Sequence, residues 1–155
     1  MEQVTSSSLE SENDILPVPP EYKINIEKGI LIATFIGGPI AGAILIAENF
    51  NRFGKETSAR NTWVFTILGI VLFTITLFYT RILEILSPIT LPFLYTGVIS
   101  LCYYNFQDKL VKTHLTNDGP IYTIDRSLLA ALIGLIIMAP IYFFAYRGIE
   151  NIGSL

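Results

Sequence analysis

Four long apolar stretches constrain this chain more than any other feature of its sequence. They cover residues 29–47, 63–80, 85–106 and 128–146. An α-helix rises 1.5 Å per residue, so ~20 residues cross the roughly 30 Å of hydrocarbon in a bilayer. Each stretch has about that length. The sequence therefore predicts an all-α, polytopic membrane protein with four transmembrane helices arranged as two helical hairpins.

Composition supports one membrane domain behind a polar tail. Charged residues make up 15% of the 155 positions, whereas soluble domains average about 25%. Residues 1–27 are rich in Ser and Pro and hold six acidic side chains against one lysine, a composition typical of disorder. Residues 28–155 are predicted to form the transmembrane domain. The net charge of −3 and the absence of a basic face argue against a nucleic-acid partner.

Small residues are dense in the first stretch, where Gly37, Gly38, Pro39 and Gly42 are the candidate packing or hinge residues. Membrane helices associate by close backbone approach, which the spacing of Gly38 and Gly42 favours. Pro39 lacks an amide proton and frees the carbonyl of Phe35, which bends or opens the helix. Two interpretations remain open. One is a kinked helix at the centre of packing, and the other is a broken helix that binds a solute at mid-membrane.

The polar flanks of the first and third stretches extend both predicted helices beyond the membrane. Gly54 is expected to cap the first of them. The two loops that result, 48–62 and 107–127, supply the candidate contact residues Asn49, Arg60, His114 and Arg126. His114 is the sole histidine and lacks the partners of a metal or catalytic site, so a histidine packed in a loop is expected.

Lysine and arginine counts predict the orientation. Six of these residues lie in the loops 48–62 and 107–127, and four lie on the other side. The first group is Arg52, Lys55, Arg60, Lys109, Lys112 and Arg126, and the second is Lys23, Lys28, Arg81 and Arg147. The positive-inside rule then places the two loops in the cytoplasm and both termini outside.

A short internal match is compatible with a duplicated hairpin. Gly42-Ala43-Ile44 precedes Asn49-Phe50, and Gly97-Val98-Ile99 precedes Asn105-Phe106. Duplication would make the two halves parallel repeats. Chance matching in apolar sequence explains the same pattern, and both interpretations stay open.

Reactive groups are absent from the predicted membrane interior. Glu48 and Glu84 come closest, and both fall near the ends of apolar stretches, which argues against a proton-coupled pump. The chain has no nucleotide-binding, zinc-protease or nucleophile-elbow motif. A single cysteine, Cys102, excludes an intrachain disulfide. No catalytic residue, cofactor or metal ion is expected, and the chain is predicted not to be an enzyme.

The segments 35–43 and 47–55 resemble a family of small four-helix inner-membrane proteins of Bacteroidota-type bacteria. That family has a Gly-Gly-Pro-Leu/Ile-Ala motif in its first helix, leading into Asn-Phe-x-x-Leu-Gly. Its later pattern is matched here by Gln107, Val111, His114, Asp118, Gly119, Tyr122, Thr123 and Arg126. The chain departs from the family at Asp125, where Trp is usual, at Asp118, where Gly is usual, and at Phe53, where Leu is usual. The resemblance implies a bacterial inner membrane and brings no activity with it.

The sequence as a whole favours a non-enzymatic packing or accessory subunit of a homo- or hetero-oligomeric membrane assembly. Its partners would be the lipid bilayer and other chains of that assembly. The alternative is a small transporter or channel subunit with a solute site at the proline-broken first helix.

Overall fold

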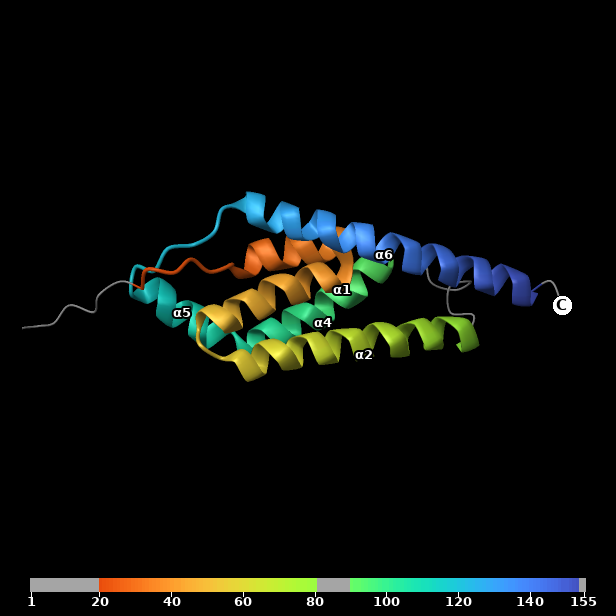
Figure 1. The fold of residues 1–155 in the computed structure, drawn as a ribbon, viewed down its shortest axis with the longest axis horizontal. Helices are drawn as coiled ribbons and strands as arrows, with labels where there is room; N and C mark the ends of the chain where they lie inside the picture. Colours follow the sequence, from red (N-terminus) through yellow and green to blue (C-terminus); the bar gives the residue numbers. More distant parts are fainter. Residues whose placement is uncertain (1–19, 81–89, 154–155) are drawn as a thin grey trace, which may run out of the picture.

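Five helices make up the part of the chain that the structure, a computed structural model, describes (Figure 1). The described residues are 20–80 and 90–153. The helices are α1 (Glu27–Arg52), α2 (Glu56–Thr80), α4 (Thr90–Phe106), α5 (Asp108–Thr116) and α6 (Ile124–Gly153). The all-helical prediction is confirmed for these residues. Three predicted segments lie partly or wholly outside the described residues. These are residues 1–19 of the tail, the connection 81–87, and residues 85–89 at the start of the third predicted span.

Helix α1 reverses its direction in the middle. At Gly38 the backbone leaves helical geometry, with φ 75° and ψ −173°. Along a straight helix, Asn25 and Asn49 would lie about 36 Å apart, yet the Asn25 amide nitrogen is 2.7 Å from the Asn49 side-chain oxygen. Figure 1 shows the two orange arms side by side. Therefore α1 is a helical hairpin, with one arm from Glu27 to Gly37 and the other from Pro39 to Arg52.

The hairpin corrects the prediction for the first span. By length and composition, α1, α2 and α6 are the described helices long and apolar enough to cross a membrane. The arms of α1, however, are only about 16 and 21 Å long, less than the roughly 30 Å of hydrocarbon. Residues 29–47 therefore form two antiparallel arms in place of the single straight span that was expected, and the predicted arrangement of four spans in two hairpins is not confirmed. Helix α4 has 17 residues, about 26 Å.

The reversal has a local cause in two adjacent residues. Gly38 has a positive φ, which costs side-chain-bearing residues energy and costs glycine none. Pro39 then opens the second arm, where its missing amide proton is not needed. Irregular backbone at membrane depth is tolerated where protein covers it, and Gly37, Gly38 and Ala41 are all buried. The sequence reveals a break here, but a bend and a full reversal have the same signature.

The hairpin is the packing centre of the described bundle. Helices α2, α4 and α6 each pack against α1 and make few close approaches to one another. A Cβ on Gly37 would lie 2.7 Å from the Ala131 Cα, and one on Gly42 would lie 3.1 Å from Ile99. On α6, Gly134 faces the Gly37 carbonyl in the same way. Contacts this close exclude any larger residue at these positions.

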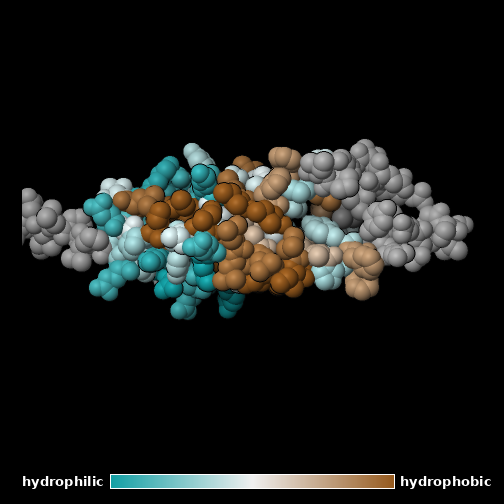
Figure 2. Space-filling model, turned by 90° about the horizontal axis from the view of Figure 1, so that it is seen from above, coloured by the Kyte–Doolittle hydropathy of each residue, from teal (hydrophilic) through white to brown (hydrophobic). Residues whose placement is uncertain are grey.

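Polar segments gather at one end of the bundle, which we call the polar end: residues 20–26, the connection 53–55, α5 and residues 117–123 (Figure 1). Figure 2 shows hydrophilic residues at this end and an apolar belt beside it. A parallel β-bridge joins Ile24 to Ile121. Residues 20–26 thus lie beside the loops 48–62 and 107–127, and the end of α6 lies opposite. The predicted orientation placed the start of the membrane domain on the side away from those loops, whereas the start of α1 lies at the same end of the bundle as they do.

Two further expectations can be compared with the structure. Gly54, with φ 68°, ends α1 as predicted, and the Lys55 amide donates to the Phe50 carbonyl at 2.8 Å. The proposed duplication is not supported, since α1 is a hairpin and α4 a single helix. Asn49 is buried, whereas its suggested counterpart Asn105 is exposed and bonds to Leu101 in its own helix.

Candidate functional site

A cluster of three buried amides, Asn25, Asn49 and Gln107, ties the polar end together. The Asn49 side-chain oxygen accepts hydrogen bonds from the Asn25 backbone amide at 2.7 Å and from its side-chain amide at 3.2 Å. The Asn49 side-chain nitrogen donates to the Asn25 carbonyl at 2.7 Å and to the Gln107 side-chain oxygen at 3.2 Å. Asn49 and Gln107 are both fully buried. We call these three residues the amide cluster.

The amide cluster connects segments that are far apart in the sequence. Gln107 lies where α4 gives way to α5, and its side-chain nitrogen donates to the Ile46 carbonyl in the second arm of α1 at 2.7 Å. Asn25 precedes the first arm of the same hairpin. A buried amide without partners costs about 1–3 kcal/mol, so these bonds fix one arrangement of the three segments against alternatives.

An ion pair lies next to the amide cluster. Glu48, on the second arm of α1, receives hydrogen bonds from Nε of Arg126 at 3.2 Å and from Nη2 at 2.9 Å. The Asn25 side-chain amide donates to the same carboxylate at 3.2 Å. The Glu48 side chain is 15% exposed and that of Arg126 is 40% exposed. This two-pronged geometry between partly buried groups holds the start of α6 against α1.

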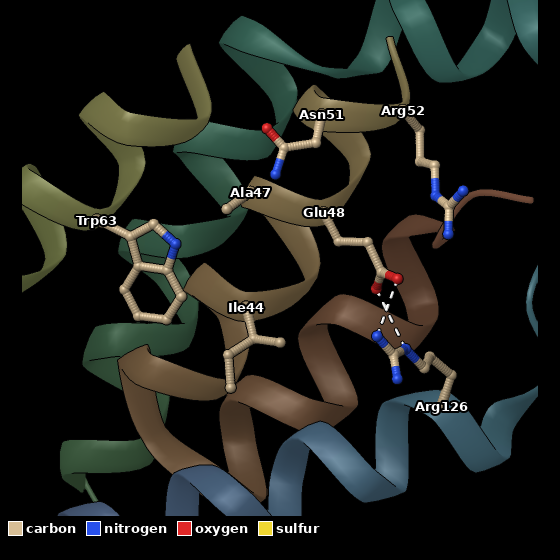
Figure 3. A pocket seen from close by; sticks show the side chains of 7 residues that line it. All are labelled: Ile44, Ala47, Glu48, Asn51, Arg52, Trp63 and Arg126. Carbon is tan, nitrogen blue, oxygen red and sulfur yellow. Dashed lines mark hydrogen bonds and ion pairs between the residues drawn. The ribbon is translucent and has the colours of Figure 1, made fainter. Parts of the chain in front are cut away.

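A pocket of about 480 Å³ opens beside this ion pair, between α1, α2 and α6 (Figure 3). We call it the arginine pocket. Its lining residues are Ile44, Ala47, Glu48, Asn51, Arg52, Trp63 and Arg126. Arg52 donates from Nη2 to the Tyr122 hydroxyl at 3.0 Å, and the Arg126 guanidinium lies 5.7 Å from the centre of the Tyr122 ring. Tyr122 therefore orients both arginines.

His114 is buried in a separate aromatic contact. Its ring centre lies 5.0 Å from that of Tyr22 and 6.2 Å from that of Phe53. Its Nε2 is 3.0 Å from the Pro120 carbonyl, and Nδ1 has no hydrogen-bond partner among the described residues. Gly119 packs directly on the ring. A side chain enclosed in this way joins α5 to residues 20–26 and to the end of α1.

The candidate hinge residues all lie in the hairpin, around its turn and at the start of its second arm. Gly37 packs on the backbone of Ala131, and a Cβ on Gly38 would lie 3.1 Å from the Met138 side chain. The Tyr95 hydroxyl donates to the Phe35 carbonyl at 3.3 Å. That carbonyl is the group that Pro39 was expected to free. The described neighbours thus fill this region with side chains and backbone from α4 and α6.

The four candidate loop residues are only partly brought together. Asn49 and Arg126 share the partners Asn25 and Glu48, and His114 lies in its own contact at the same end. Arg60 is exposed on α2 and lines neither the arginine pocket nor the amide cluster.

Neither Asn25 nor Gln107 was among the candidate contact residues. Asn25 stands alone before an apolar stretch and has no distinctive spacing. Gln107 is one of several polar residues in a row and was matched only as part of the family pattern. Asn105 looked equally suitable, but it lies on the exposed side of α4.

The polar end offers hydrogen-bonding and charged groups that can recognise and position a ligand. Among the described residues, no group of three or more His, Cys, Asp or Glu side chains could hold a metal ion. Glu48 is occupied by Arg126 and Asn25, and no nucleophile lies beside it in the arginine pocket. Guanidinium groups directed into an open pocket are suited to binding an anion.

Comparison of the chain with protein-family models, with curated proteins and with solved structures finds no match.

Proposed function

We propose that this chain is a non-enzymatic accessory subunit of a larger membrane assembly, and that the membrane is the bacterial inner membrane implied by the family resemblance. The observation that carries the proposal is the way the long helices pack. Each of α2, α4 and α6 rests on the hairpin, and they make few close approaches to one another. Figure 1 shows α2 and α6 continuing past the turn of the hairpin.

Helices in a bilayer associate through close packing, because lipid tails are as apolar as their side chains. Beyond the hairpin turn, the described residues supply α2 and α6 with little of this packing. A second copy or another subunit would supply it.

Two glycines on exposed helix surfaces support the proposal that the chain associates with another chain. A Cβ on Gly69 of α2 or on Gly97 of α4 would meet no atom within 4 Å. Both residues lie on exposed helix surfaces, where a glycine permits the backbone of another helix to approach closely. Gly37 and Gly134 serve that purpose inside the chain, so we infer that Gly69 and Gly97 serve it between chains.

Association in lipid tests the proposal. The full chain in nanodiscs, or cross-linked in native membranes, is expected to be oligomeric or bound to another membrane protein. Gly97→Leu and Gly69→Leu should reduce that association while leaving the unfolding temperature unchanged. Ile136→Leu, an exposed change on α6, is the control. A wild-type chain that stays monomeric in native membranes and captures no partner would contradict the proposal.

The hairpin itself favours a second candidate, a small transporter or channel subunit. Re-entrant and broken helices occur where solutes cross membranes. The packing of Gly37 and Gly38 against α6 weighs against an open path at the turn. Solute or ion flux into proteoliposomes that is lost in Gly38→Val would favour this candidate over the first.

A further inference from the structure

The arginine pocket has the charge of an anion-binding site. Arg52 and Arg126 contribute two guanidinium groups, and Glu48 contributes one carboxylate. That carboxylate is already bonded to Arg126 and Asn25. The lining therefore carries a net positive charge, with one of its two cations not neutralised inside the pocket.

Both arginines keep donors for a ligand while their positions are held. Arg126 uses Nε and Nη2 on Glu48, and Arg52 uses Nη2 on Tyr122. The other guanidinium nitrogen of Arg126 makes no hydrogen bond to another described residue. Planar guanidinium groups bind phosphate through two parallel bonds, and donors already oriented lose less entropy on binding.

The surroundings of the arginine pocket indicate what kind of molecule would carry the anion. Trp63 forms one wall, and Figure 3 shows its indole nitrogen turned toward the side where Ala47 and Glu48 lie. Tryptophan is enriched at the level of lipid headgroups. Ile44 and Ala47 add an apolar part to the α1 side of the pocket, next to the polar residues Glu48, Asn51 and Arg52. On α2, the exposed residues Val64 and Leu68 continue from Trp63 toward the apolar belt.

We propose that the arginine pocket binds the phosphodiester headgroup of an anionic glycerophospholipid. Arg52 and Arg126 hold the phosphate, Trp63 lies beside the glycerol, and the acyl chains follow the exposed surface of α2. Basic pockets between membrane helices are a recognised type of lipid headgroup site. The inference does not depend on whether the chain forms part of an assembly.

Lipid retention tests this inference on the full chain. Native mass spectrometry would compare phosphatidylglycerol with phosphatidylcholine bound to the wild type and to two variants, Arg52→Gln and Trp63→Leu. Arg60→Gln is the matched control, because it removes the same charge from an exposed site outside the pocket. Loss of one charge-assisted contact should weaken phosphatidylglycerol binding about tenfold in Arg52→Gln, and Arg60→Gln should bind as the wild type does.

The results of this experiment distinguish a lipid phosphate from a soluble phosphate. Preferential retention of phosphatidylglycerol that falls in Arg52→Gln and in Trp63→Leu supports the proposal. Equal retention of both lipids, or equal losses in Arg52→Gln and Arg60→Gln, would overturn it. Competition by inorganic phosphate or glycerol phosphate at millimolar concentration would also overturn it, since the pocket would then bind a soluble anion.

Discussion

The polar end and the opposite half of this bundle are held together by different interactions. At the polar end, buried amides, an ion pair and a β-bridge join five segments through directed hydrogen bonds. Toward the other end, the described helices touch mainly by close packing on the two arms of α1. The hairpin of α1 accounts for this division. Its two arms are shorter than the hydrocarbon of a bilayer, and hydrogen bonds at their open ends hold the arms side by side.

The tie also supplies partners to buried backbone groups just before the first arm begins. Because the arms of α1 are antiparallel, the start of the first arm lies beside the end of the second. Asn49 can therefore bond both to the amide and to the carbonyl of Asn25. One side chain closes the hairpin at its base, opposite the turn at Gly38.

The largest expected effect concerns which side of the membrane each end occupies. Because α1 returns to the polar end, epitope tags inserted after Lys23 and after Lys55 should be accessible from the same side, and a tag at the C-terminus only from the other. Protease or antibody access in right-side-out and inverted vesicles measures this. Finding the first two tags on opposite sides would show that α1 crosses the membrane. The two ends of α1 could then not both belong to the polar end.

Removing the Asn49 side chain should be the most destabilising single change at the polar end. Asn49→Leu leaves the backbone amide and carbonyl of Asn25 and the side-chain oxygen of Gln107 without their partner. At the lower end of about 1–3 kcal/mol for each group, a loss of at least about 3 kcal/mol is expected. Unfolding by SDS titration in mixed micelles measures it. Asn105→Leu is the matched control, since Asn105 is exposed and bonds within its own helix, and it should change stability by less than about 0.5 kcal/mol. Similar losses in both variants would mean that the buried cluster contributes little.

A buried glycine and an exposed glycine test how closely the helices pack away from the polar end. In Gly37→Ala the new methyl group would meet the backbone of Ala131, which cannot move aside, so a loss of about 2–3 kcal/mol is expected. Gly97→Ala enters open space and should leave stability unchanged or raise it by up to about 1 kcal/mol, because alanine favours helix. The same SDS titration measures both variants. A tolerated Gly37→Ala would place the hairpin farther from α6 than the structure does.

The sequence predicts features of the fold that depend on neighbouring residues better than features that depend on contacts between distant residues. Helical structure, the Gly54 cap and a break at Gly38-Pro39 follow from local patterns, and all three are present among the described residues. The direction of the chain after the break is set by contacts with Ala131, Met138 and Asn25, which come from positions far along the chain. A kink and a reversal therefore look identical in sequence, and the sequence did not predict that residues 20–26 lie beside residues 117–123.

The site shows the same limit. Arg126 and Asn49 were singled out from their positions in polar loops, but their partners were not. Glu48 was expected to lie near the end of an apolar stretch, but its bonds with Asn25 and Arg126 were not predicted. Gln107 and Asn105 differ by only two positions, yet that rotation around the helix separates a buried side chain from an exposed one.

The smallest expected effect distinguishes charge from hydrogen bonding within the polar end. A double-mutant cycle of Glu48→Gln and Arg126→Gln should give a coupling energy of about 1 kcal/mol, above most exposed pairs because Glu48 is largely shielded from solvent. The coupling should fall little between low salt and 0.5 M salt, since partly buried pairs are screened less than exposed ones. The pair of Lys112 and Asp108, at 2.7 Å but with a more exposed lysine, is the internal standard. A Glu48 coupling as salt-sensitive as that of Lys112 would mean that water reaches the pair freely, and the polar end would then depend on its amides alone.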